Sequence, residues 1–210
     1  MISTLPLPLS LAERNDAPEI LRAEATFEEY LEFAEVCEYN VDFFDNQLIS
    51  MGQASLPHEL LVARLITIFS NAVENNDDYQ VYGSNIKVHI PACVASFNAD
   101  VTVIKGEPDY LLLASGKRST TEIQNPAVIV EILSKTTYNY DLGTKLSCYK
   151  TLPSLKQVIF IDQDKVSVQS YTRTDDPHTW INHDLDSLAM SLPVLDFEVS
   201  LQHIYKKIKF

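Results

Sequence analysis

Two short segments decide the fold: Asn98-Ala-Asp-Val-Thr-Val-Ile104 and Ala127-Val-Ile-Val-Glu-Ile-Leu133. The second is a near-continuous apolar run, which is typical of a strand that is covered on both faces of a sheet. The first is a shorter strand that contains an acid. Helical and strand-like patterns are mixed along the chain, and no Gly/Ser linker divides it. We therefore predict an α/β protein with a central mixed sheet.

The elements around these two strands follow from periodicity and caps. Thr26 and Glu29 have the spacing of a capping box, and Leu61, Leu65 and Ile68 recur at helical spacing. The expected elements are a helix over 26–36, strands in 41–51 around an Asp45-Asn46 turn, a helix over 57–75, strands in 80–90, a helix over 138–150, a hairpin of strands 157–162 and 165–171, and a short helix over 201–208.

The N-terminal segment is apolar but holds two prolines and no basic residue in positions 1–12. That composition argues against a secretory signal and indicates an extended arm, which we place at residues 1–25. The arm's leucines have no obvious partner within the chain; they are Leu5, Leu7, Leu9 and Leu11. We therefore expect a homodimer in which the arm contacts the other subunit.

The bulk composition is that of a globular protein, with 46% hydrophobic and 21% charged residues in a chain of 210. No apolar run approaches the ~18 residues that cross a bilayer, so we expect no membrane association. The three cysteines are odd in number and widely spaced, which indicates neither a disulfide framework nor a zinc site. We expect a cytoplasmic protein.

The charge balance weighs against a strong nucleic-acid binder. Sixteen Lys and Arg against 29 Asp and Glu give a formal net charge of -13, whereas proteins that neutralise phosphates usually present a basic face. We expect weak non-specific affinity for DNA.

Two acids enter the apolar strands. Burial of an isolated carboxylate such as Glu131 is costly, so a strand that keeps one usually places a cation or a metal beside it. A sheet-edge Glu paired to a structural Arg or Lys would satisfy the same pattern. Asp100 is a second acid in a core strand, and two such carboxylates can share one divalent cation. Taken alone, an acid at the start of a strand such as Asp100 is more often a turn or cap residue.

Lys145 lies on the helix that follows, four residues after Asp141. It either points into the sheet, where it would stabilise charge on a phosphate, or forms a surface pair with Asp141 worth ~0.3–0.5 kcal/mol.

These residues occur in segments that resemble the Uma-type restriction endonuclease family of the PD-(D/E)XK nuclease superfamily. The resemblance runs from about Val41 to the C-terminus, and its order and spacing match as well as its residues. The matching segments are Ala99-Asp-Val-Thr-Val-Ile-Lys-Gly-Glu-Pro108, Asn125-Pro-Ala-Val-Ile-Val-Glu-Ile-Leu-Ser134, Tyr140-Asp-Leu-Gly-Thr-Lys145 and Tyr149-Lys-Thr-Leu-Pro-Ser-Leu155. The resemblance implies a restriction-endonuclease-like core, a mixed sheet flanked by helices, in a single domain over residues 26–210.

The resemblance also implies roles for individual residues. Asp100 matches the first Asp of the motif and Glu131 the second acid. The usual lysine two residues later is replaced by Leu133, and Lys145 is the matching position on the next helix. The expected metal ligands for Mg²⁺ or Mn²⁺ are Asp100, Glu131 and the carbonyl of Ile132.

Further positions carry or depart from the family pattern. His58 matches a family histidine and is expected to support the site or substrate, with Asp141, or else to be a hydrogen-bonded core residue. Ala99 replaces the motif's proline, which changes backbone rigidity. Gln47 stands where relatives often have Glu, so this chain lacks an acidic side chain at that position.

The function that these features favour is metal-dependent endonuclease activity on DNA. One alternative is a catalytically silent relative that uses the fold for binding or assembly, which the acidic charge and Gln47 favour. A weaker alternative is an enzyme that acts on a small phosphate ester.

Overall fold

Strand β10 (Pro126–Leu133) is the centre of the fold, and all eight of its residues are buried. In the computed structural model, which describes residues 5–210, β10 pairs antiparallel with β7 (Val101–Lys105) and parallel with β11 (Gln157–Asp162). The sheet has the order β13-β12-β11-β10-β7-β4. It is completed by β4 (Tyr79–Gly83), β12 (Val168–Arg173) and β13 (Trp180–Leu185). The predicted α/β architecture with a mixed sheet is confirmed.

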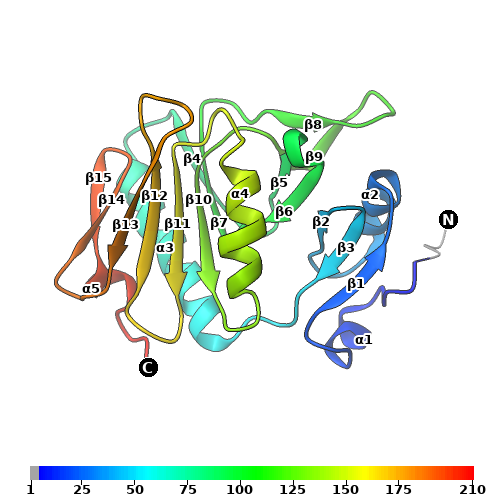
Figure 1. Cartoon of the computed structure of the whole chain (residues 1–210), viewed down its shortest axis with the longest axis horizontal. Helices are drawn as coiled ribbons and strands as arrows, with labels where there is room; N and C mark the ends of the chain where they lie inside the picture. Colours follow the sequence, from blue (N-terminus) through cyan, green and yellow to red (C-terminus); the bar gives the residue numbers. More distant parts are fainter. Residues whose placement is uncertain (1–4) are drawn as a thin grey trace.

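Helices lie on both faces of this sheet (Figure 1), and successive side chains of a strand such as β10 point to opposite faces. Val128, Val130 and Ile132 pack with the apolar stripe of α3 (Leu56–Val73). Ile129 and Leu133 pack with α4 (Leu146–Tyr149). This arrangement explains the unbroken apolar run and places Glu131, between Ile129 and Leu133, on the α4 side.

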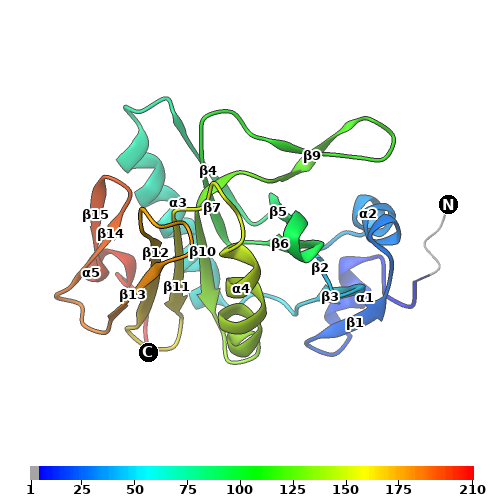
Figure 2. The same ribbon diagram turned by 45° about the horizontal axis from the view of Figure 1, so that its top comes forward.

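A second sheet lies beside the first, towards the N-terminal part of the molecule (Figure 2). Its strand order is β1-β3-β2-β6-β5-β9-β8. The strands are β1 (Leu21–Glu24), β2 (Asp42–Phe44), β3 (Gln47–Ser50), β5 (Lys87–Ile90), β6 (Ala95–Asn98), β8 (Tyr110–Leu112) and β9 (Arg118–Ile123). Asp45 and Asn46 both have positive φ in the β2–β3 turn, as the turn prediction requires.

Helix α2 (Phe27–Val36) covers part of this second sheet. Its predicted capping box is present, because Thr26 accepts from the backbone of Glu29 and Glu29 accepts from the backbone of Thr26. A smaller hairpin of β14 (Ser191–Val194) and β15 (Phe197–Ser200), followed by α5 (Leu201–Ile204), adds to the core on the α3 side.

The prediction of an extended arm over residues 1–25 is wrong for the part that the structure describes; Met1 to Thr4 lie outside it. The segment forms α1 (Leu11–Asn15) and β1, which pairs with β3. Leu5, Leu7 and Leu9 belong to an apolar cluster with α2. These three leucines therefore have a partner in their own chain, and the reason given for a homodimer no longer applies to them.

The expectation about cysteines is also wrong. Cys93 and Cys148 form a disulfide, with their Cα atoms 5.9 Å apart, although 55 positions separate them in sequence. Cys93 ends a short 3-10 turn after β5 and Cys148 lies on α4, and both turn and helix belong to one apolar cluster. Tertiary packing, which residue spacing does not report, brings them together.

Three elements differ clearly in extent from the prediction. The helix expected over 138–150 is interrupted by a π-helical turn over Tyr140–Lys145, and the second hairpin strand begins at Val168 rather than at residue 165. The helix expected over 201–208 ends at Ile204. No helix in the described chain is long and apolar enough to cross a membrane.

Candidate active site

The antiparallel register between β7 and β10 brings the two predicted carboxylates together. Val101 is paired with Val130, so the next position places Asp100 opposite Glu131. Asp100 is held there because its Oδ2 accepts the backbone N–H of Ile132 at 2.7 Å. Asp100 therefore lies at the entry to β7, on the strand next to Glu131.

Lys145 points into the protein and meets three carboxylates. Its Nζ lies 3.1 Å from Glu131 Oε1, 3.3 Å from Asp141 Oδ1 and 3.5 Å from Asp42 Oδ2. The residue is only 5% exposed. Burial alone would lower the lysine pKa, but the three carboxylates raise it well above its ordinary value. The Asp141–Lys145 pair exists, but it is buried rather than on the surface.

Glu131 is 2% exposed and is held from two sides. Its Oε1 accepts from the Tyr149 hydroxyl at 2.6 Å as well as from Lys145. Burial raises the pKa of Glu131 well above its ordinary value, against the opposing effect of Lys145. Burial likewise raises the pKa of Asp141.

His58 lies in the first turn of α3, whose N-cap is Ser55. The His58 Nε2 is 3.3 Å from Asp100 Oδ2, and Nδ1 is 3.7 Å from Glu59 Oε1. Burial lowers the pKa of His58, but the hydrogen bond and charge of Asp100 outweigh it and raise the pKa above its ordinary value. The histidine therefore contacts one of the two predicted carboxylates directly.

Sequence reasoning missed two members of this group, Asp42 and Tyr149. Asp42 comes from β2 in the second sheet, and its Oδ1 accepts from the backbone and side-chain amides of Asn98, both at 2.8 Å. An acid within the apolar segment Val41-Asp-Phe-Phe44 is the same signal that singled out Glu131. Tyr149 carried no such signal, since a tyrosine on an apolar helical stripe is ordinary core material.

Gln47 is not part of the group. Its side-chain oxygen accepts from Arg22 at 3.2 Å in an exposed position, and it does not line the pocket described next.

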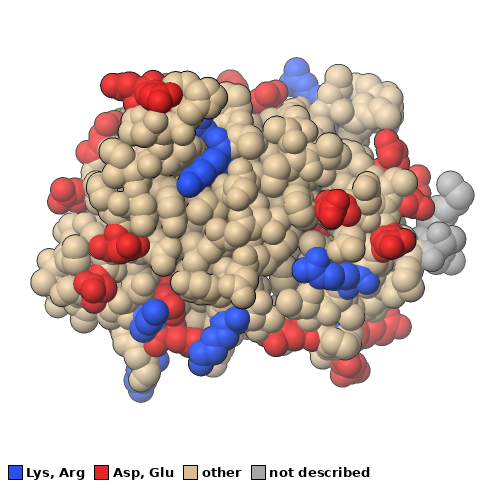
Figure 3. Space-filling model, viewed as in Figure 1, with Lys and Arg blue, Asp and Glu red and all other residues tan. Residues whose placement is uncertain are grey.

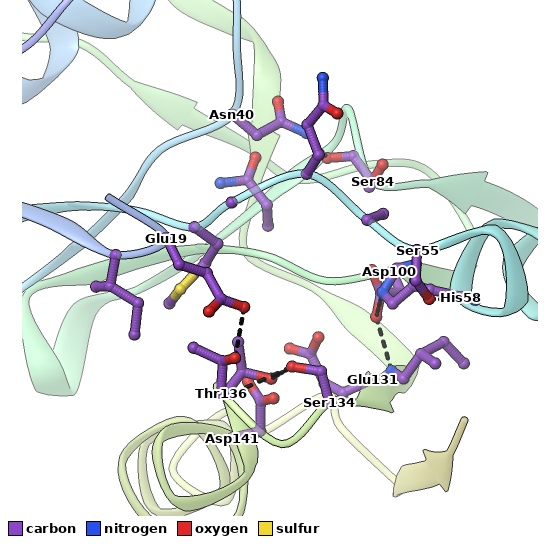
Figure 4. Close-up of a pocket in the computed structure, with 18 of the residues that line it drawn as sticks. Glu19, Asn40, Ser55, His58, Ser84, Asp100, Glu131, Ser134, Thr136 and Asp141 are labelled. Atoms are coloured by element: carbon purple, nitrogen blue, oxygen red, sulfur yellow. Dashed lines mark hydrogen bonds and ion pairs between the residues drawn. The ribbon is translucent and has the colours of Figure 1, made fainter. Parts of the chain in front are cut away.

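A pocket of about 440 Å³ lies between the two sheets, and Asp42 and the other carboxylates of the group line it. Asp100, Glu131, Asp141 and His58 are seen on its walls in Figure 4, and Ile132 and Lys145 also line it. The opposite wall comes from the segment around α1 and from residues 51–55, which join β3 to α3. The site thus lies at the seam between the sheets.

The chemical type of these donor atoms, carboxylate oxygen, suits a hard divalent cation. Asp42, Asp100, Glu131 and Asp141 supply four carboxylates against the single ammonium of Lys145, and carboxylate oxygens are the ligands that Mg²⁺ and Mn²⁺ prefer. Within residues 5–210, however, no three His, Cys, Asp or Glu side chains form a ready metal cluster. The protein would therefore supply few ligands and leave the rest of the shell to water, as Mg²⁺ sites commonly do.

Comparison with known proteins gives the family. Residues 27–202 match the Uma2 family model, described as "Putative restriction endonuclease". The chain belongs to the Uma2 family. Two uncharacterized proteins of Synechocystis sp. are similar to this Uma2 chain. One is 28% identical over 183 residues, covering 87% of this chain and 92% of the relative. The other is 27% identical over 151 residues, covering 72% and 82%.

A solved structure shows the same fold. The crystal structure of a "putative nuclease belonging to DUF820" from Anabaena variabilis matches with a TM-score of 0.68 at 16% identity, covering 86% of this chain and 97% of that one. The predicted restriction-endonuclease-like fold and the predicted family are thereby confirmed. Family and fold together support a nuclease.

Proposed function

We propose that this Uma2 protein is a divalent-metal-dependent endonuclease that hydrolyses phosphodiester bonds in DNA. One observation carries the proposal: Asp100 and Glu131 come from neighbouring strands and share a pocket with the buried Lys145. Mg²⁺ or Mn²⁺ would be held by Asp100, Glu131 and the Ile132 carbonyl. Such an ion polarises a phosphate and lowers the pKa of bound water.

The protein's own groups orient this chemistry. The Ile132 N–H fixes one oxygen of Asp100, and Tyr149 and Lys145 fix one oxygen of Glu131. Lys145 keeps its proton, since three carboxylates raise its pKa, and would supply a fixed positive charge for the transition state. His58 and Asp141 hold Asp100 and Lys145 in place.

A metal titration followed by a cleavage assay tests the proposal. Wild-type protein should bind Mg²⁺ or Mn²⁺ by calorimetry and cut DNA. Asp100→Asn and Glu131→Gln should weaken metal binding and cleavage together. Asp78→Asn and Glu198→Gln, which change exposed acids outside the pocket, are the matched controls. Wild-type protein that binds no metal at millimolar concentration and cuts nothing would contradict the proposal.

A specific observation favours a second candidate, a nuclease-fold protein that binds or assembles without cutting. The chain carries a net charge of -13, and acidic groups are spread around the face seen in Figure 3, where basic groups form no stripe. Such a surface repels a polyanion. Absence of both metal binding and cleavage would support this candidate.

Cytoplasmic localisation and a homodimer also stay proposals for this protein. Sedimentation at micromolar concentration tests the dimer. The Cys93–Cys148 disulfide weighs against a cytoplasmic location, because thiols in the cytoplasm are usually kept reduced.

A further inference from the structure

A cover formed by residues 14–20 closes one side of the pocket. It is shaped by Arg14, which is 3% exposed. The Arg14 guanidinium donates to the backbone oxygens of Pro18 at 3.0 Å and Glu19 at 2.8 Å, and to the Ser50 hydroxyl at 2.6 Å. Because Ser50 ends β3, a buried arginine fixes the cover against the second sheet.

Glu19 extends from this cover to the far wall of the pocket. Its Oε1 accepts from the Thr136 hydroxyl at 2.5 Å, a contact drawn as a dashed line in Figure 4. Both residues are exposed, so the contact lies at the mouth of the pocket. A Cβ at Gly52 would come within 3.1 Å of Glu19 Cγ. The absence of a side chain at Gly52 lets Glu19 pack this closely.

A second contact ties down the strap of residues 51–55. The Ser55 hydroxyl donates to the side-chain oxygen of Gln163 at 2.6 Å, in the loop that follows β11. Two hydrogen bonds thus link the cover and the strap to the first sheet. Glu131 and Lys145, which are 2% and 5% exposed, line the same pocket as the cover and the strap, so a phosphate that reaches them passes the wall that these two segments form.

The two buried cations that line the pocket are already engaged: Arg14 holds the cover and Lys145 holds three carboxylates. Lys135, which also lines the pocket, is exposed and forms a surface pair 3.6 Å from Asp164. The lining also includes the carboxylates of Glu19 and Glu59. A duplex carries one negative charge per ~1.7 Å of its axis. Because it is stiff, it cannot bring a single phosphate into the pocket without also bringing neighbouring phosphates close to these acids. A single strand can bend and unstack to do so.

We propose that the cover makes this site selective for phosphodiesters in flexible single-stranded DNA or at strand ends, and that Glu19 is the specificity-determining residue. The inference rests on the proposed nuclease function. By narrowing entry with a carboxylate fixed at the mouth, the protein excludes an intact duplex.

Three substrates test the inference in Mn²⁺: the p-nitrophenyl ester of thymidine 5′-monophosphate, a short oligothymidylate, and a blunt duplex of the same length. Wild-type protein should cleave the first two at least about tenfold faster than the duplex. Glu19→Gln and Thr136→Val should raise duplex cleavage severalfold and leave the small ester unchanged. Glu24→Gln and Thr120→Val, exposed positions away from the pocket, should change nothing.

The outcomes separate this inference from the proposed function. Equal cleavage of duplex and single strand by wild-type protein would overturn the inference and keep the nuclease. If no substrate is cut, the proposed function fails, and binding of the labelled oligothymidylate and duplex in Mg²⁺ decides the inference. Preference for the single strand, with duplex binding gained in Glu19→Gln, supports it. Equal binding, or none, overturns it.

Discussion

Replacing Lys145 by Met removes the one ammonium that faces three carboxylates within 3.5 Å. Met retains most of the side-chain volume, so the change is mainly one of charge. Removing one partner of a buried ion pair costs ~3–5 kcal/mol, against ~5–15 kcal/mol for the whole stability of a domain. A surface pair of Asp141 and Lys145 would cost only ~0.3–0.5 kcal/mol. We therefore expect Lys145→Met to lower the free energy of unfolding of the metal-free protein by several kcal/mol, about 3–5.

The stability that Lys145→Met loses should depend on pH. Burial raises the pKa values of Glu131 and Asp141, and Lys145 opposes that rise. Without Lys145, both folded-state pKa values move further above their unfolded values, so the variant takes up protons on folding. Its stability should then fall as pH rises above the unfolded values, near ~4, by up to about 1.4 kcal/mol per pH unit per group. The variant should be closest to wild type in mild acid.

Urea denaturation with a chelator, at pH about 5 and about 8, measures both effects. Lys156→Met, at an exposed lysine, is the matched control. A loss for Lys145→Met below about 1 kcal/mol and equal at both pH values would refute the reasoning, because it would match a solvated surface pair. Added Mg²⁺ should restore part of the stability if the carboxylates bind it.

Three other changes have clear expected outcomes. Replacing Cys93 and Cys148 together by Ala should lower the free energy of unfolding by about 2–4 kcal/mol, and reduction of wild-type protein should do the same, whereas replacing the free cysteine should not. Tyr149→Phe removes the hydrogen bond to Glu131 and should cost about 1–3 kcal/mol, more at high pH because that bond lowers the Glu131 pKa. Thr26→Ala removes the capping box of α2 and should cost about 1 kcal/mol in a thermal melt.

Local signals were enough to predict much of this fold. The continuous apolar run of β10, the capping box at Thr26 and the stripe on α3 each depend on residues near one another in sequence, and each element formed as predicted. Glu131 in β10 and Asp100 just before β7 were found because a carboxylate in or beside an apolar strand is costly and therefore conspicuous.

What escaped prediction depends on contacts between distant segments. Asp42 joins the group only because β2 of one sheet lies against β6, and β6 leads into Asp100. The Cys93–Cys148 bond and the pairing of β1 with β3 likewise join segments that are far apart in sequence. Nothing in the sequence around Glu19 indicates that it crosses the pocket to Thr136, since exposed glutamates are ordinary.

The position of the carboxylate group at the seam between the sheets has a consequence for biosynthesis. Its members are spread from Asp42 to Tyr149, and the β11 strand that flanks Glu131 ends only at Asp162. Chains generally fold from the N-terminus as they emerge from the ribosome. The second sheet is complete in sequence by Ile123, well before Lys145 is made. A nascent or truncated chain therefore carries acids without their arrangement, and the site comes into existence only when the first sheet is completed against the second.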